Sequence, residues 1–478
     1  MAGVEMKVDL TPAVNAALSG DNQRIVAAAQ DILKQGEHAD VLIGRLGVLA
    51  SHGDKDGHPT ITLGATAMLS RLLHTIPQPL EGEVLPHERA LPLFVYALLA
   101  SADALRAGQN VTITSPKPIF PSDLGETQTV GEAMHKAIYG NDPETTERLL
   151  LGLYGTGADY RTLQVRAYDG IAATFQNSGH PLMFAVRGFQ VLDAVEWGTA
   201  VPDILHWLAP HLPLVPNNDE PAWIPDLREY VNNPANSVAG IRTRLSIPKD
   251  GNALPLRNLV LSDSDTTKVC QGVYDALMKG EASPRAVSSV IALAAADILM
   301  KINDDSRDLF IKTAHGLLFA AAARQVFRQV QDVEVLPLLF TSAAYVNALY
   351  KAVIAEHAPV TPTAARTTQV RGGGLIAPAM LETLAMQINA QDYADALGTA
   401  TRYIKLGYDV RALFATIAVG AAQSDPTNDK GHSMQIVQAA SEEFMAWPIR
   451  LRETSPEPFL AAALRAALFG TRHNVLEA

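Results

Sequence analysis

The chain has 478 residues, of which 48% are hydrophobic and 18% are charged. A chain of this length and hydrophobicity can bury several contiguous apolar layers, so we expect a globular protein. Its formal net charge of -12 at pH 7 offers no basic stripe for phosphate groups, which excludes nucleic acid as an expected partner.

The number of cysteines and the length of the apolar runs limit the kinds of metal site and the membrane association that the protein can have. The single cysteine, Cys270, excludes an internal disulfide and any cysteine-ligated metal site, so a metal must be held by His, Asp, Glu or water. The longest apolar runs, residues 91–102 and 287–296, end well before the roughly 20 residues that a membrane-spanning helix needs. Residues 1–9 lack the apolar region of a signal peptide. We therefore expect no membrane association and a cytoplasmic location.

The first predicted unit covers residues 1–107. Thr11, which a proline follows, is typical of a helix start, and apolar residues then recur at helical spacing. A polar loop over residues 51–57 leads to His58, where another helix begins, and a last helix is expected over residues 88–105. The unit thus has four helices and one polar loop.

Three further units show a similar layout, in which a helix follows the marked histidine or, in the third unit, runs through it. They cover residues 126–212 with His180, 268–356 with His315, and 375–478 with His432. Between the second and third units, residues 213–267 are rich in proline and are expected to form an irregular arm or lid. The predicted fold is therefore all-α, with four tandem helical repeats of about four helices each, packed around a common core and joined by long irregular linkers.

The four histidines each follow a small residue. The pairs are Gly57-His58, Gly179-His180, Ala314-His315 and Gly431-His432. If the repeats close into a ring, corresponding positions converge on one axis, where four imidazoles would form an all-nitrogen metal site. We predict that His58, His180, His315 and His432 hold a transition metal ion, with iron as the expected metal. The alternative is that each histidine bonds the backbone of a neighbouring helix and serves packing alone.

Acidic residues flank these histidines. His52, Asp54 and Asp56 alternate along the loop before His58, and we predict that they are catalytic, with His52 or a nearby aspartate as proton carrier. Carboxylates near the other histidines are suited to orienting ligating imidazoles; they are Asp304, Asp305, Asp308, Asp425 and Asp429. A loop that alternates His and Asp also occurs as an ordinary solvated loop, so the residues leave both interpretations open.

Two of the histidine stretches resemble a known family. The segment from His58 to Gly64, His-Pro-Thr-Ile-Thr-Leu-Gly, is similar to the His-Pro-aliphatic-Ile-His-Leu-Gly stretch of questin oxidase-like proteins and related bacterial helical proteins, some of which are joined to a Rieske domain. The stretch around His315, Ala-His-Gly-Leu-Leu, resembles a later helix of that family. Thr62 stands where the family has a second histidine, and the cysteines of a Rieske centre are absent.

What the resemblance implies is an oxidoreductase that acts with O2 on an aromatic, quinone-like or polyketide-like small molecule. The residues themselves support an all-α repeat protein with a central histidine site. Together with what the resemblance implies, they leave three hypotheses open. The first is a metal-dependent oxidase or monooxygenase with a central histidine site, working as a homo-oligomer or with a redox partner protein. The second is a non-enzymatic helical scaffold that binds a protein partner. The third is a cofactor-free oxidase whose histidines act as bases.

Overall fold

The computed structural model describes most of the chain. The described residues are 7–126, 128–157, 159–172, 175–213, 220–241, 246–302, 306–329, 332–357, 359–366, 376–472 and 476. All regular secondary structure within these ranges is helical, and the single β-bridge there joins Ser424 and Arg472. The predicted all-α class is confirmed.

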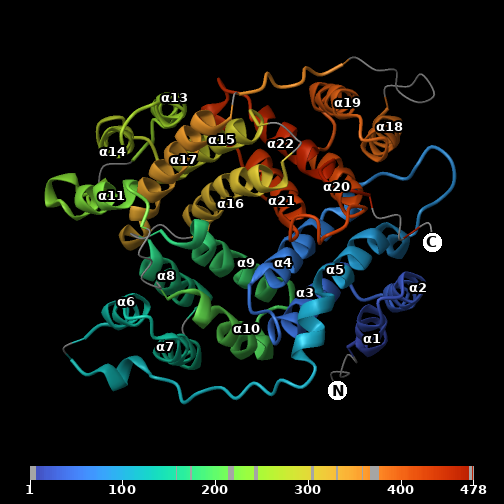
Figure 1. Ribbon diagram of the computed structural model, residues 1–478, viewed down its shortest axis with the longest axis horizontal. Coiled ribbons are helices and arrows are strands. Elements are labelled where there is room, and N and C mark those ends of the chain that lie inside the picture. Colours follow the sequence, from blue (N-terminus) through green and yellow to red (C-terminus); the bar gives the residue numbers. More distant parts are fainter. Residues whose placement is uncertain are drawn as a thin grey trace.

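Four helices form a ring at the centre of the molecule, as Figure 1 shows. They are α4 (His58–Ser70), α9 (His180–Ala194), α16 (Arg307–Gln329) and α21 (His432–Met445). Each contacts the next in cyclic order, and the last, α21, contacts the first, α4. The chain therefore closes a ring of four helices that are far apart in sequence. The histidines in contact between neighbouring helices are 117 or 122 residues apart.

Each inner helix is flanked by the helix before it and the helix after it. The flanking helices are α3 (Ala39–Ser51) and α5 (Pro86–Gly108), α8 (Tyr160–Ile171) and α10 (Val201–Leu208), α15 (Pro284–Leu299) and α17 (Pro337–Glu356), and α20 (Val410–Ala421) and α22 (Glu457–Ala467). The order outer, inner, outer thus recurs around the ring (Figure 1). That the four groups are copies of one repeated unit stays a prediction.

The remaining helices pack outside this double layer. They are α1 (Thr11–Ser19), α2 (Asn22–Leu33), α6 (Val130–Tyr139), α7 (Pro143–Gly155), α11 (Trp223–Asn232), α13 (Pro255–Val260), α14 (Thr266–Tyr274), α18 (Ala377–Asn389) and α19 (Tyr393–Lys405). Short turns of 3-10 helix join several of them, and a π-helical turn, Asp275–Lys279, follows α14. The first predicted unit therefore contains five helices rather than four.

Residues 213–267 differ from the expected irregular arm. Their described part includes α11, α13 and the start of α14, and α11 and α14 pack against each other and against α17. The irregular arm was predicted from the prolines in this segment. A proline is nevertheless tolerated in the first turn of a helix, where its missing N–H is not needed. On α11 the buried residues Ile224, Leu227 and Tyr230 lie at helical spacing.

The inner helices carry little exposed surface. On α9 almost every residue is buried, and such a helix has neighbours on all sides. Among the described residues, α5 and the stretch Val333–Ala355 are long and apolar enough to cross a membrane, but more than half of each is buried inside the protein, as in the core helices of globular proteins. The ring is therefore the core on which the candidate site is built.

Candidate metal centre

Three of the four predicted histidines are the first residue of an inner helix. His58 begins α4, His180 begins α9 and His432 begins α21, each after a glycine in the left-handed region. His315 differs, because it lies inside α16, eight residues after that helix begins. The ring geometry still brings it to the level of the others.

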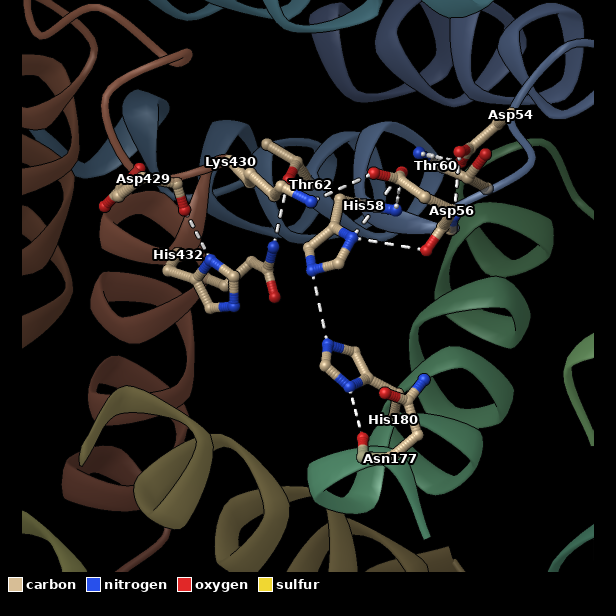
Figure 2. Close-up of polar contacts among 12 residues, drawn as sticks. Asp54, Asp56, His58, Thr60, Thr62, Asn177, His180, Asp429, Lys430 and His432 are labelled. Atoms are coloured by element: carbon tan, nitrogen blue, oxygen red, sulfur yellow. Dashed lines mark hydrogen bonds and ion pairs between the residues drawn. The ribbon is translucent and has the colours of Figure 1, made fainter. Parts of the chain in front are cut away.

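The four imidazoles converge on one point of the ring axis. One ring nitrogen from each lies within 4.8 Å of the corresponding nitrogen of every other. The Nε2 atoms of His58 and His180 are 3.2 Å apart, and those of His315 and His432 are 2.9 Å apart. Figure 2 shows His58, His180 and His432 pointing toward a common centre from three different helices. The four histidines could hold a metal ion.

Backbone carbonyls fix the orientation of three of these rings. Nδ1 of His180 bonds to the carbonyl oxygen of Asn177, and Nδ1 of His432 bonds to that of Asp429. Nδ1 of His58 lies 3.2 Å from the carbonyl oxygen of Asp56. A carbonyl oxygen only accepts, so Nδ1 carries the proton in each ring. The neutral ring then presents an Nε2 lone pair to the axis, which is how a metal-ligating histidine is held.

The contact between His58 and His180 is consequently a contact between two lone pairs. Two neutral rings repel each other at 3.2 Å in this arrangement, and either a proton or a metal ion between the two nitrogens makes the approach favourable. Two imidazole nitrogens bound at about 2.1 Å to one ion lie about 3.0 Å apart in an octahedral site and about 3.4 Å apart in a tetrahedral one. The observed separations of 3.2 and 2.9 Å fall in or near this range.

Burial keeps three of the rings neutral. It lowers the pKa of His180 to about 4, that of His432 to about 3 and that of His315 to about 2. The N-terminal ends of α4, α9 and α21 add positive potential at the site, which also disfavours imidazolium. Because a metal binds neutral imidazole, the site needs no proton release from these three rings at neutral pH.

The predicted carboxylates Asp54 and Asp429 hold the turns that carry the histidines. Asp54 accepts hydrogen bonds from the backbone N–H groups of Gly57 at 2.8 Å and Thr60 at 2.9 Å. Asp429 accepts from the backbone N–H of Ser433 at 2.7 Å and from its hydroxyl. Burial raises the pKa of both carboxyl groups. Their geometry is that of positioning groups, because each bonds the backbone next to a histidine.

Asp56 lies at the rim of the site. Its carboxylate is 3.5 Å from Nδ1 of His58 and 3.3 Å from Nζ of Lys430, which comes from the loop before His432 (Figure 2). The hydrogen bond to His58 holds the pKa of the Asp56 carboxyl below its usual range. This ion pair joins the first and last parts of the ring beside His58, the most exposed of the four histidines.

His52 is directed to a different neighbour. Its Nε2 atom lies 3.4 Å from the carboxylate of Asp203 on α10. It is outside the group of four converging histidines, so its predicted role as proton carrier stays a prediction. Of the other acidic residues, Asp425 bonds Thr427 within its own loop, and Asp304 and Asp305 lie outside the described residues.

The structure adds two residues that the sequence did not single out. The ring of Phe184 lies 5.2 Å from that of His180 and 6.2 Å from that of His58, measured between ring centres. His211, at the end of the turn after α10, lies 4.7 Å from Phe184, and burial lowers its pKa to about 4. Phe184 could have been found from its spacing of four residues after His180. The contact of His211 depends on tertiary packing.

Comparison with known proteins gives no assignment for this centre. No family model, curated protein or solved structure matches the chain. The resemblance to questin oxidase-like proteins is therefore untested, and the function has to be argued from the centre itself.

Proposed function

We propose that the protein is a metal-dependent oxidoreductase whose transition metal ion is held by His58, His180, His315 and His432. The observation that carries the proposal is the approach of Nε2 atoms to 3.2 Å between two rings whose Nδ1 atoms both face acceptors. A proton could bridge one such pair, whereas a metal ion accounts for the convergence of all four rings. Packing alone would not require four ring nitrogens to meet at one point.

The ligand set allows a redox-active metal. Imidazoles suit copper, iron and nickel as well as redox-inert zinc, and no carboxylate lies among the four converging groups. We take iron as the metal and O2 as the oxidant, on the resemblance of the His58 and His315 stretches to questin oxidase-like proteins. The hypothesis of a cofactor-free oxidase is disfavoured. The imidazoles of His180, His315 and His432 have pKa values of about 2 to 4, so they are weak general bases at neutral pH.

We propose that the substrate binds beside His58, the most exposed of the four histidines. Phe184, Trp207 and His211 form an aromatic cluster beside it, with ring centres 4.7 to 5.9 Å apart and ring planes 57° to 65° from one another. Phe184 and Trp207 are buried. Aromatic side chains with few polar groups around them are typical of sites for small aromatic molecules. The bound ion would supply oxidation chemistry, while these side chains orient the substrate and exclude water.

Elemental analysis of the purified, tag-free protein tests the proposal. We expect near-stoichiometric iron, copper, manganese or zinc in the wild type and none in a His58→Ala/His315→Ala variant. A His74→Ala variant is the matched control, because His74 bonds only the nearby carbonyl of Arg71 on the surface. A His58→Gln/His315→Gln variant covers the case in which the alanine variant does not fold. Metal-free wild type after reconstitution, or unchanged metal in the folded variants, would refute the proposal and favour a scaffold.

The turn carboxylate Asp429 provides a second prediction. An Asp429→Ala change removes the acceptor of Ser433 and frees the loop whose carbonyl orients His432. Metal affinity should fall about 10- to 100-fold, as for other groups that orient ligands. Competition with a chromophoric chelator measures it. Asp425→Ala is the control, since the carboxylate of Asp425 accepts hydrogen bonds from Thr427 in the same loop and the substitution keeps its backbone bonds. Equal losses in both variants would contradict the expected role.

A further inference from the structure

A stripe of buried polar side chains runs along α21 away from the metal centre. It starts at His432 and continues with Gln435, Gln438 and Glu442, which are three or four residues apart and therefore lie on one face of the helix. The first three are at most 1% exposed. The interior of a ring of packed helices is normally apolar, so this stripe needs an explanation.

The near end of the stripe is anchored to a neighbouring helix. The amide Nε2 of Gln435 donates to the hydroxyl of Thr62 on α4 at 3.0 Å. Thr62 lies four residues after His58, so this bond sits one helical turn beneath the histidines. It shows that this part of the polar face of α21 contacts the neighbouring inner helix α4.

The far end of the stripe reaches across the ring axis. Glu442 accepts from Nε2 of Gln190 at 3.2 Å and lies 4.0 Å from the guanidinium of Arg187, both on α9. Arg187 also donates to Gln190 at 2.6 Å. Because α9 and α21 stand on opposite sides of the ring (Figure 1), these contacts bridge the ring at the end away from the histidines. The side chain of Glu442 is 19% exposed there, so the stripe ends at solvent.

Gln438 lies between these two anchored ends. Both polar atoms of its amide are buried, and neither has a hydrogen-bond partner among the described protein groups. Leaving a buried amide unbonded costs free energy, so such groups are almost always paired with protein or ordered water. The steps from His432 to Gln435, Gln438 and Glu442 are about 4.5 to 6 Å of helix rise, which one or two bridging waters can span.

We propose that the interior of the ring holds a hydrated relay that carries protons between the metal centre and Glu442. The relay rests on the proposed function and adds a second route to that site. Substrate would enter at the His58 edge, while protons reach the centre from the opposite end of the ring. The charged groups around Glu442 are Arg187, Asp193 and Glu443.

The neighbouring residue Glu443 offers a matched control. It is also buried on α21, but its carboxylate faces α16, where it lies 3.4 Å from the guanidinium of Arg324. Both members of that pair are sealed from solvent, with side-chain exposures of 2% and 0%. A Glu443→Gln change is therefore the same chemical change one residue away, outside the stripe.

A crystal structure that resolves water tests the hydration directly and needs no metal. We expect ordered waters on both amide atoms of Gln438, with a water chain toward Glu442, and their loss in a Gln438→Leu variant. A dry interior, or protein groups bonded to both amide atoms, would overturn the relay and leave the proposed function standing. A hydrated interior in a protein that binds no metal would overturn both.

Proton movement is measured on protein loaded with Co(II), whose visible absorption responds to the protonation of a metal-bound water. After a stopped-flow pH jump, the spectral change should be at least fivefold slower in Gln438→Leu and in Glu442→Gln than in the wild type. Glu443→Gln should respond at the wild-type rate. Equal rates in Glu442→Gln and Glu443→Gln, or a wild-type spectrum that ignores the jump, would overturn the relay.

Discussion

Metal-free protein is expected to lose stability steeply as the pH falls from 6.5 toward 4. Folding lowers the pKa values of His180, His315 and His432 to about 4, 2 and 3, whereas the unfolded chain binds protons at the ordinary histidine value. The unfolded state therefore binds more protons in this window, and stability falls as the pH falls. Each histidine contributes about 1.4 kcal/mol per pH unit.

Buried carboxyl groups oppose this trend, because burial raises the pKa values of Asp54, Asp429 and Glu443. Burial raises the pKa of Glu443 to about 7, so the folded state binds a proton there that the unfolded state releases above pH 4.5. Its contribution is fully present below pH 4.5 and is lost as the pH rises through 7. The net slope for the three histidines and Glu443 is about 3 kcal/mol per pH unit, and His211, whose pKa burial also lowers to about 4, adds to it. Over two pH units this matches a large part of the 5 to 15 kcal/mol of a typical domain.

Urea unfolding followed by circular dichroism at several pH values measures this slope. A His315→Gln change should flatten it by about 1.4 kcal/mol per pH unit, because it removes one of the three protons. Glu443→Gln should steepen it, and His74→Gln, at the surface, should leave it unchanged. Bound metal should shift the loss of stability to lower pH, since it competes with protons for the rings. A stability independent of pH between 7 and 5 would contradict the expectation.

The sequence was sufficient to predict the helical class and the convergence of the histidines. Apolar residues at helical spacing define the helices, and the recurrence of one small residue and one histidine marked the positions that meet. His58, His180 and His432 were the clearest, because each begins a helix after a glycine. His315 was found by the same pattern, and the helix expected to run through it agrees with its place inside α16.

Other features of the site depend on tertiary packing and left no local signal. The roles of Asp54 and Asp429 as turn-holding groups depend on which backbone N–H groups face them after folding. The contact of His211 with Phe184 joins two helices that sequence spacing does not relate. The prediction missed the helices of residues 213–267 because it took their prolines as signs of irregular structure. The conformation of this segment is decided instead by the packing of apolar helix faces against α17.

The glycine turns before three of the histidines pack against the next inner helix of the ring, and the same contact recurs in each case. Gly57 packs against Phe184, Gly179 against Phe319, and Gly431 against Thr62. Each contacted residue lies four positions after the histidine of the neighbouring inner helix, one helical turn beneath it. Each turn therefore sets the height of its own histidine against the neighbouring helix, which aligns the rings.

Replacing Gly57 with Ala is expected to destabilise the protein by about 2 to 4 kcal/mol and to weaken metal binding at least tenfold. The residue has φ of 83°, where an L-residue costs about 1 kcal/mol or more. A methyl group there would also lie 2.5 Å from the Phe184 ring, and overpacking typically costs about 1 to 3 kcal/mol. Relief of that clash moves the turn, and with it His58.

Gly407→Ala separates the two contributions. Gly407 has nearly the same φ, 78°, but a methyl group there would meet nothing within 4 Å. Its substitution should cost about 1 kcal/mol, from backbone strain alone, and leave metal affinity unchanged. Urea unfolding and chelator competition measure both quantities in the two variants.

A double-mutant cycle then assigns the clash to Phe184. In a Phe184→Leu background the smaller side chain leaves room for the added methyl group, so Gly57→Ala should cost about as little as Gly407→Ala. Metal affinity should recover in the double variant relative to Gly57→Ala, because the turn returns and carries His58 back to the axis. Equal costs of Gly57→Ala in both backgrounds would mean that the turn is not set by Phe184, and the alignment of the four rings would need another cause.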